Sequence, residues 1–91
     1  MELKWTPSAL RDLDDAGEYI AQDNLQAAAE MGRRALEAVE YLDQYPALGR
    51  LGRVRGTREL VVSGTPFLVV YRVRLDTVQV LRVLHHARKW P

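Results

Sequence analysis

Cysteine is absent from this 91-residue sequence, and so is any long run of apolar residues. Without thiols the fold has neither disulfides nor thiolate metal ligands, which suits a protein of a reducing compartment. The longest uninterrupted apolar run spans Phe67–Tyr71, far too short to cross a bilayer, and the N-terminal residues lack the basic and apolar segments of a secretion signal. We therefore expect a single soluble domain, residues 1–91, that makes no membrane contact and stays in the cytoplasm.

Acidic residues are scarce in the second half of the chain. Residues 47–91 carry nine basic side chains and two acids, Glu59 and Asp76, whereas residues 1–46 carry four basic side chains and ten acids. Eight of the nine cations are arginines, whose planar guanidinium groups suit bidentate contacts with phosphate or carboxylate. The asymmetry indicates a polyanionic ligand or an acidic partner at the C-terminal half. The alternative is that the two halves complement each other within the fold.

Helical spacing in the first half and alternating apolar residues in the second half divide the chain into elements. Thr6 and Pro7 predict a helix start with Thr6 as the N-cap, and Asn24 predicts the N-cap of a second helix. Two short turns, at 63–66 and 75–77, separate three β-branched and aromatic runs. The predicted elements are a strand at 2–5, helices at 7–22 and 24–44, a basic loop at 47–56, strands at 57–62, 67–74 and 77–84, and a C-terminal tail at 85–91.

These elements predict an α+β domain in two layers. An antiparallel helical hairpin would pack on an antiparallel sheet, and the short N-terminal strand would join an edge of that sheet. Asp12 lies early in the first helix, where it suits the positive end of the helix dipole. The residues expected to face the core are Leu10, Leu13, Gly17 and Ile20 of the first helix and Phe67, Val69, Tyr71 and Val73 of the strand at 67–74.

Two adjacent histidines follow the last predicted strand. His85 and His86 could serve as a general acid or base, because imidazole titrates near neutral pH. Adjacent residues on a strand point to opposite faces, and no cluster of cysteine, histidine or carboxylate completes a metal site. The glycines of 49–56 lack the strand–loop–helix setting of a phosphate loop. We therefore expect neither a metal nor a cofactor.

Several short motifs follow one another along nearly the whole chain. They are the helix start Thr6-Pro7-Ser8-Ala9, then Tyr45-Pro46, Gly49-Arg50, Arg58-Glu59-Leu60, the segment 66–73 and the C-terminal segment 83–91. In this order they resemble the RelE/ParE superfamily of bacterial type II toxins. The resemblance implies the same order of strand, helical hairpin and antiparallel sheet. It also implies a cognate antitoxin, usually encoded beside the toxin, whose C-terminal segment wraps the toxin and blocks it.

The superfamily divides by activity. The resemblance implies either a RelE-like endoribonuclease, which binds the ribosome and cleaves mRNA, or a ParE-like toxin, which poisons DNA gyrase. Leu68 stands where the RelE branch has a strand arginine, and no counterpart of that branch's C-terminal tyrosine occurs up to Pro91. These departures favour a ParE-like toxin that arrests growth, stabilises plasmids, and contacts DNA only through its antitoxin complex. The alternatives are the endoribonuclease and a non-toxic binding module.

The resemblance also implies which side chains carry the function. For the ParE-like toxin we expect contact with the target or the antitoxin, without bond breaking, from Arg58, Arg72, Arg82, Arg88, Lys89 and Trp90. For the endoribonuclease the candidate catalytic residues are His85, His86 and Arg88. A structural role as an ion pair or loop anchor is an alternative for Arg58 and Glu59, and Trp90 could cover an open sheet edge.

Overall fold

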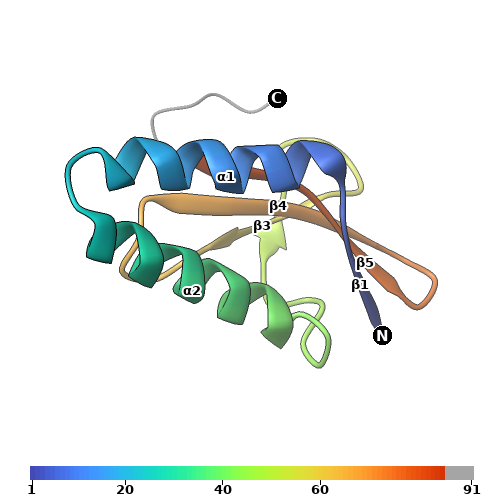
Figure 1. Cartoon of the computed structure of the whole chain (residues 1–91). Coiled ribbons are helices and arrows are strands. Elements are labelled where there is room, and N and C mark those ends of the chain that lie inside the picture. The colour runs from blue at the N-terminus through green and yellow to red at the C-terminus, as the bar shows by residue number, and fades with distance from the viewer. Residues whose placement is uncertain (86–91) are drawn as a thin grey trace.

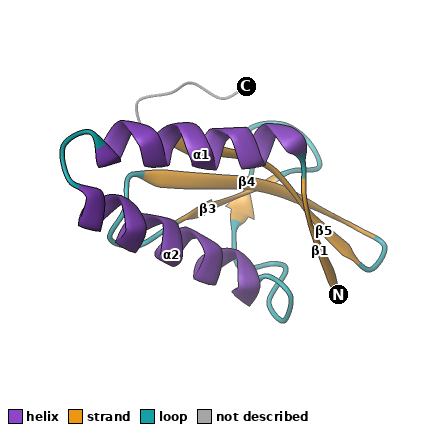
Figure 2. Ribbon diagram, in the orientation of Figure 1, coloured by secondary structure: helices purple, strands orange, loops and turns teal. Residues whose placement is uncertain are grey.

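The computed structural model describes residues 1–85 as two helices that cover one face of a five-stranded sheet (Figures 1 and 2). The elements are β1 (Glu2–Trp5), α1 (Pro7–Ala21), α2 (Leu25–Tyr41), β2 (Arg50–Leu51), β3 (Arg58–Val61), β4 (Phe67–Arg74) and β5 (Thr77–His85). The predicted α+β class is therefore confirmed. No helix among the described residues combines the length and the apolar character needed to cross a membrane.

Both predicted helix caps are confirmed. Thr6 Oγ1 accepts a hydrogen bond from the backbone N–H of Ala9 at 3.1 Å, and Asn24 Oδ1 accepts one from Ala27 at 3.0 Å. The second helix ends at Tyr41 rather than at residue 44. After Tyr41, the N–H of Leu42 donates to the residue three positions earlier, so the chain tightens into a turn instead of continuing the α-helix.

The sheet has the order β1-β5-β4-β3-β2 and is mixed, which corrects the predicted antiparallel sheet. β1 pairs with β5 in parallel, from Glu2 opposite Thr77 to Trp5 opposite Val80. A parallel pair needs a long connection, and here the helices and three strands supply it. The predicted basic loop also contains β2, two residues that pair antiparallel with β3.

The core lies between the helices and the sheet face that they cover. The predicted core face of β4 is confirmed, since Phe67, Val69 and Tyr71 are at most 2% exposed. In α1 the predicted stripe is partly wrong, because Leu10 is 49% exposed while Ala9 and Asp12 are buried. The buried stripe therefore includes a charged residue, Asp12, which apolar spacing does not indicate. The main buried apolar residues are Ala9, Ala35, Val39, Leu42, Val62, Phe67, Val69, Tyr71, Val78, Val80 and Val83.

A β-bulge in β5 connects the start of α1 to the sheet. Val70 pairs with Arg82 and Tyr71 pairs with Val80, so Leu81 is the extra residue. The Leu81 carbonyl accepts a hydrogen bond from Thr6 Oγ1 at 3.0 Å, while the same hydroxyl oxygen caps α1. One threonine therefore satisfies both the helix end and the bulge.

Candidate binding surfaces

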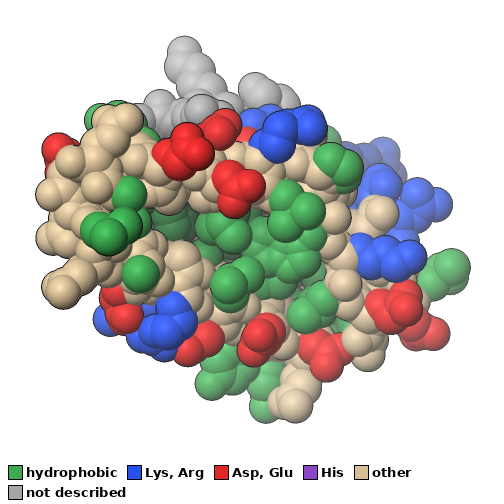
Figure 3. Space-filling view, viewed as in Figure 1, with side chains coloured by type: hydrophobic (Ala, Val, Ile, Leu, Met, Phe, Trp, Pro, Cys, Tyr) green, Lys and Arg blue, Asp and Glu red, His purple; other side chains and the backbone are tan. Residues whose placement is uncertain are grey.

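The sheet does not bring the predicted arginines together on one face. Strand pairing places Arg50, Glu59 and Val70 in one row across three strands, on the face away from the helices. Val70 pairs with Arg82 beside the bulge, and the Arg82 guanidinium binds Asp12 of α1. Arg58 is opposite the core residue Tyr71 and therefore lies on the other face. On the helical side, both acidic and basic side chains are scattered over the surface, with basic groups at the right-hand side, at the top and at the lower left (Figure 3).

Arg58 and Tyr71 fix the loop that precedes β2. Arg58 Nη1 donates to the carbonyl of Gly49 at 2.8 Å, and the Tyr71 hydroxyl donates to the carbonyl of Pro46 at 2.7 Å and accepts from the N–H of Gly49 at 2.8 Å. A Cβ on Gly49 would lie 2.8 Å from the Tyr71 ring, so only glycine fits there. Burial raises the pKa of Tyr71, against the opposing effect of the Gly49 N–H and Arg58. The phenol therefore stays neutral and able to donate.

Arg82 joins the sheet to α1 through Asp12. Its Nε and Nη2 donate to the two carboxylate oxygens of Asp12 at 2.6 Å and 3.0 Å. The backbone N–H of Val83 donates to the same carboxylate at 3.0 Å, beyond the part of β5 that β1 covers. The hydrogen bond that Arg82 donates to Asp12 raises the pKa of Arg82, so this guanidinium stays charged. Asp12 thus takes the place of a strand carbonyl at the open edge of β5.

Arg72, on the face away from the helices, binds a residue that is close in sequence. Its Nε donates to Oε1 of Gln79, its cross-strand neighbour, at 2.6 Å. The arginine side chain is partly exposed. The three strand arginines predicted to bind a partner, Arg58, Arg72 and Arg82, therefore each have a hydrogen-bond partner within the fold. Their contact with another molecule stays a prediction.

Glu59 is a buried carboxylate beneath the loop arginines. It is 2% exposed, and its oxygens accept hydrogen bonds from Arg50 Nη2 and from the backbone N–H of Arg53, each at 3.0 Å. Burial raises the pKa of Glu59, but these two hydrogen bonds and the charges of both arginines outweigh it and hold the pKa below its usual value. The expected loop-anchoring role of Arg58 and Glu59 is confirmed, since each holds part of the loop from its own face of β3.

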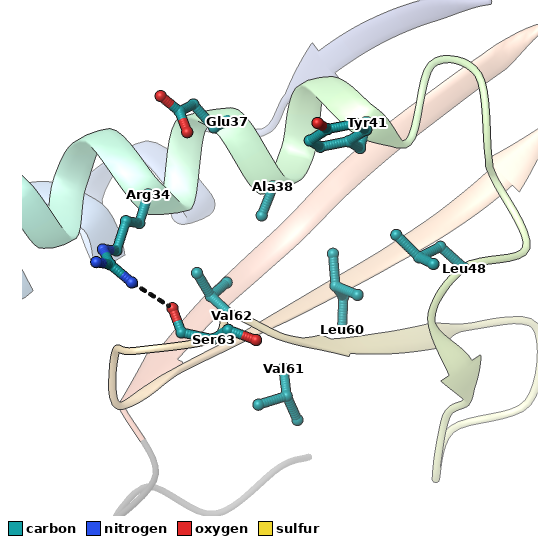
Figure 4. Close-up of a pocket in the computed structure, with 9 residues that line it drawn as sticks. All are labelled: Arg34, Glu37, Ala38, Tyr41, Leu48, Leu60, Val61, Val62 and Ser63. Atoms are coloured by element: carbon teal, nitrogen blue, oxygen red, sulfur yellow. Dashed lines mark hydrogen bonds between the residues drawn. The ribbon is translucent and has the colours of Figure 1, made fainter.

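An apolar groove of about 420 Å³ lies between α2 and β3 (Figure 4). Leu60 points from β3 towards the helix, and Arg34 reaches from α2 to the carbonyl of Ser63, at 3.4 Å. β2 pairs only with Arg58 and Glu59, so within residues 1–85 the outer edge of β3 beyond them has no strand partner. The groove is lined by Arg34, Glu37, Ala38, Tyr41, Leu48, Leu60, Val61, Val62 and Ser63.

The groove is more exposed than a core pocket. Tyr41, Leu48 and Val61 are 61%, 55% and 61% exposed. Tyr41 and Leu48 share the groove with Leu60, whereas the Val61 side chain points to the opposite side of β3 from Leu60 (Figure 4). Exposed apolar side chains that share one groove form a surface that a partner would cover. The search for charged residues missed this groove. Its signal in the sequence is the apolar side chains that lie around Pro46, between the predicted second helix and the following strands: Tyr41, Tyr45 and Leu48.

Four predicted site residues, His86, Arg88, Lys89 and Trp90, lie outside the described residues, and their roles stay predictions. His85 ends β5 opposite Phe67 and is partly exposed. Within residues 1–85 no three histidine or carboxylate side chains are placed to hold a metal ion. The prediction also left Arg50 and Arg53 out of the site, although Glu59, the single acid among residues 47–75, indicated where the loop arginines would gather.

Known proteins resemble this chain over nearly its full length. The family model for the ParE toxin of the type II toxin-antitoxin system parDE matches residues 3–90. The Y4kP protein of Sinorhizobium fredii is 45% identical over 98% of this chain and 92% of its own, and Toxin RelE2 of Caulobacter vibrioides is 38% identical over 96% of this chain and 97% of its own.

A solved structure described as the chromosomal ParDE TA system from P. aeruginosa agrees with this fold. It superposes with a TM-score of 0.83 at 32% identity, covering 91% of this chain and 92% of that one. The predicted RelE/ParE-like architecture and toxin function are confirmed. With two helices on a five-stranded mixed sheet and a match over residues 3–90, this chain belongs to the ParE toxin family of type II toxin-antitoxin systems.

Proposed function

We propose that this toxin arrests growth in the cytoplasm by binding DNA gyrase and is neutralised by a cognate antitoxin that covers the groove between α2 and β3. The toxin would act by protein contact and contact DNA only within the antitoxin complex. Family membership supports the toxin and its antitoxin. The choice of target rests on the strand arginines.

The main observation behind the choice of target is that the strand arginines already form hydrogen bonds within the fold. Arg58 donates to loop carbonyls, Arg72 to Gln79 and Arg82 to Asp12. Cleavage of RNA requires cationic donors aimed at the phosphate and a positioned acid or base. Guanidinium groups held by internal acceptors are poorly placed for that purpose. Leu68, on the same face of β4 as Val70, adds apolar surface and no donor. This arrangement supports protein contact over bond breaking.

The groove between α2 and β3 supports the proposal that an antitoxin segment binds there. A segment that becomes ordered on binding must bury much apolar surface to offset its loss of conformational entropy. The groove offers that surface, and the unpaired outer edge of β3 offers backbone groups for an added strand. The partner would therefore place apolar side chains over Tyr41 and Leu48.

Gyrase supercoiling of relaxed plasmid tests the target. Purified toxin is expected to inhibit supercoiling or to accumulate gyrase-cleaved plasmid, and pre-incubation with the antitoxin is expected to restore normal products. Normal supercoiling at excess toxin would remove gyrase as the target.

A ribosome-dependent endoribonuclease is the second candidate. It is favoured by the relative named Toxin RelE2 and by the position of His85 at the end of β5. This activity predicts codon-phased cuts in mRNA in a translating extract, lost in His86→Ala and Arg88→Ala. Intact transcripts in that extract would exclude it.

A further inference from the structure

The hairpin that joins β2 to β3 is a rigid platform for arginine side chains. The N–H of Gly52 donates to the carbonyl of Thr57 at 2.8 Å, and both the N–H and the hydroxyl of Thr57 donate to the carbonyl of Val54, at 3.1 Å and 2.6 Å. Gly56 has a φ of +84°, which closes the turn with Arg55 at its tip. We call residues 50–58 the arginine hairpin.

Close contact within the arginine hairpin explains why glycine begins its turn. A Cβ on Gly52 would lie 2.2 Å from the hydroxyl oxygen of Thr57, closer than any real side-chain contact. Thr57 is buried, and its hydroxyl is committed to Val54. Any other residue at position 52 would move the turn that carries Arg53 and Arg55.

Glu59 orders the arginines without removing them from solvent. It bonds Arg50 Nη2 and the backbone of Arg53, and Arg53 Nε lies 3.8 Å from the same carboxylate. The side chains of Arg50 and Arg53 nevertheless remain 58% exposed. With Arg58 left aside because it lies on the other face of β3, Arg50, Arg53 and Arg55 against Glu59 leave a local charge of 3 − 1 = +2. Side chains ordered before binding lose less entropy when a partner arrives.

The composition of the arginine hairpin fits a protein partner better than a nucleic acid. Residues 50–58 hold no aromatic side chain on which a base could stack. Leu51, which pairs with Arg58, is 78% exposed and adds apolar surface beside the arginines. Arginine is enriched in protein interfaces.

We propose that the arginine hairpin docks an acidic surface of the protein that this toxin inhibits. The inference rests on the proposed function. The groove between α2 and β3 supplies the large apolar area that an antitoxin segment needs, whereas the arginine hairpin supplies charge on a fixed frame. Such a surface speeds encounter with a folded, acidic partner and sets its orientation. Antitoxin and target therefore use different surfaces.

The test compares two double variants with the same loss of charge. Arg53→Ala/Arg55→Ala removes two hairpin arginines, and Arg11→Ala/Arg33→Ala removes two exposed arginines of the helices. We expect the hairpin variant to need about tenfold more protein to inhibit supercoiling. It should also lose growth arrest on induction and still co-purify with the antitoxin. The helix variant should behave as the wild type, and circular dichroism should show both folded.

Added salt provides a second readout. Inhibition by the wild type should weaken as NaCl is raised, and inhibition by the hairpin variant should weaken less. Equal potency of the two double variants would overturn the proposal. So would a hairpin variant that stays toxic but no longer binds antitoxin, or one that loses binding to a labelled oligonucleotide that the wild type binds. If the wild type arrests growth without affecting gyrase, the gyrase target fails, and growth arrest by the two variants still decides the role of the hairpin.

Discussion

Arg58 and Glu59 are neighbours in sequence, yet they act on opposite faces of β3. Arg58 reaches the carbonyl of Gly49 on the helical side, and Glu59 binds Arg50 and the backbone of Arg53 on the other side. Alternation along a strand produces this division. Two adjacent residues therefore hold consecutive parts of one loop, and a change in either should disturb a different part.

The lowered pKa of Glu59 makes its contribution to stability depend on pH. The unfolded chain takes up a proton at this residue near pH 4.3, and the folded chain does so only at lower pH. Below pH 4.3 the unfolded state thus binds more protons, and the stabilisation is lost as pH falls through the folded-state pKa. It is fully present at neutral pH.

Glu59→Gln should accordingly lower the free energy of unfolding at pH 7 by about 1 to 3 kcal/mol, since it weakens hydrogen bonds to a buried charge. The variant should then lose less stability than the wild type between pH 7 and pH 3. Urea unfolding across this range measures both effects. Glu40→Gln, at an exposed carboxylate of α2, is the matched control and should follow the wild type. Parallel curves for wild type and Glu59→Gln would contradict the assignment.

At the scale of elements, local signals in the sequence were sufficient for the helices and for β4. Thr6-Pro7 and Asn24 mark the helix starts because side-chain caps act within three residues. Alternation of side chains marks the buried face of β4, because successive residues of a strand point to opposite faces and the signal is again local. The parallel pairing of β1 and the two-residue β2 depend on contacts between distant segments. No local pattern encodes such contacts.

The binding surfaces were predicted less well than the fold. Arginine spacing showed that a basic region exists but gave no sign of which guanidinium groups the fold itself would bind. Asp12 shows this most clearly. An acid near a helix start is favoured by the helix dipole, whether or not it also binds an arginine 70 residues later in the chain. Arg82 and Asp12 meet only because the fold brings α1 against β5.

The Asp12–Arg82 pair should couple α1 to β5. Asp12 is 8% exposed and Arg82 32%, so removing either leaves the other poorly solvated. A cycle of Asp12→Ala, Arg82→Ala and the double variant should give a coupling free energy of about 1 to 3 kcal/mol in urea unfolding. The same cycle on Arg33 and Glu37, an exposed pair four residues apart in α2, should give about 0.5 kcal/mol or less. Equal couplings would contradict a special role for Asp12.

For the whole molecule, we propose that neutralisation and toxicity use two separate surfaces. The groove is apolar and lies between α2 and β3, and the arginine hairpin is charged and follows the loop that Tyr71 and Arg58 fix. A toxin that used one surface for both partners would lose both functions together on mutation. Two surfaces allow variants that lose one function and keep the other.

Substitutions in the groove should therefore produce toxin that its antitoxin no longer neutralises. Tyr41→Asp and Leu48→Asp place a carboxylate in an apolar contact that the antitoxin must bury, which should weaken the complex by about 2 kcal/mol or more, or roughly thirtyfold. Both side chains are more than half exposed, so the toxin should still fold. Co-purification with the antitoxin should fall, and growth should stop even when the antitoxin is co-expressed. Leu75→Asp, at the 96% exposed tip of the β4–β5 turn, introduces the same charge away from the groove and should remain fully neutralised. Neutralisation of the groove variants as complete as that of Leu75→Asp would place the antitoxin elsewhere on the toxin.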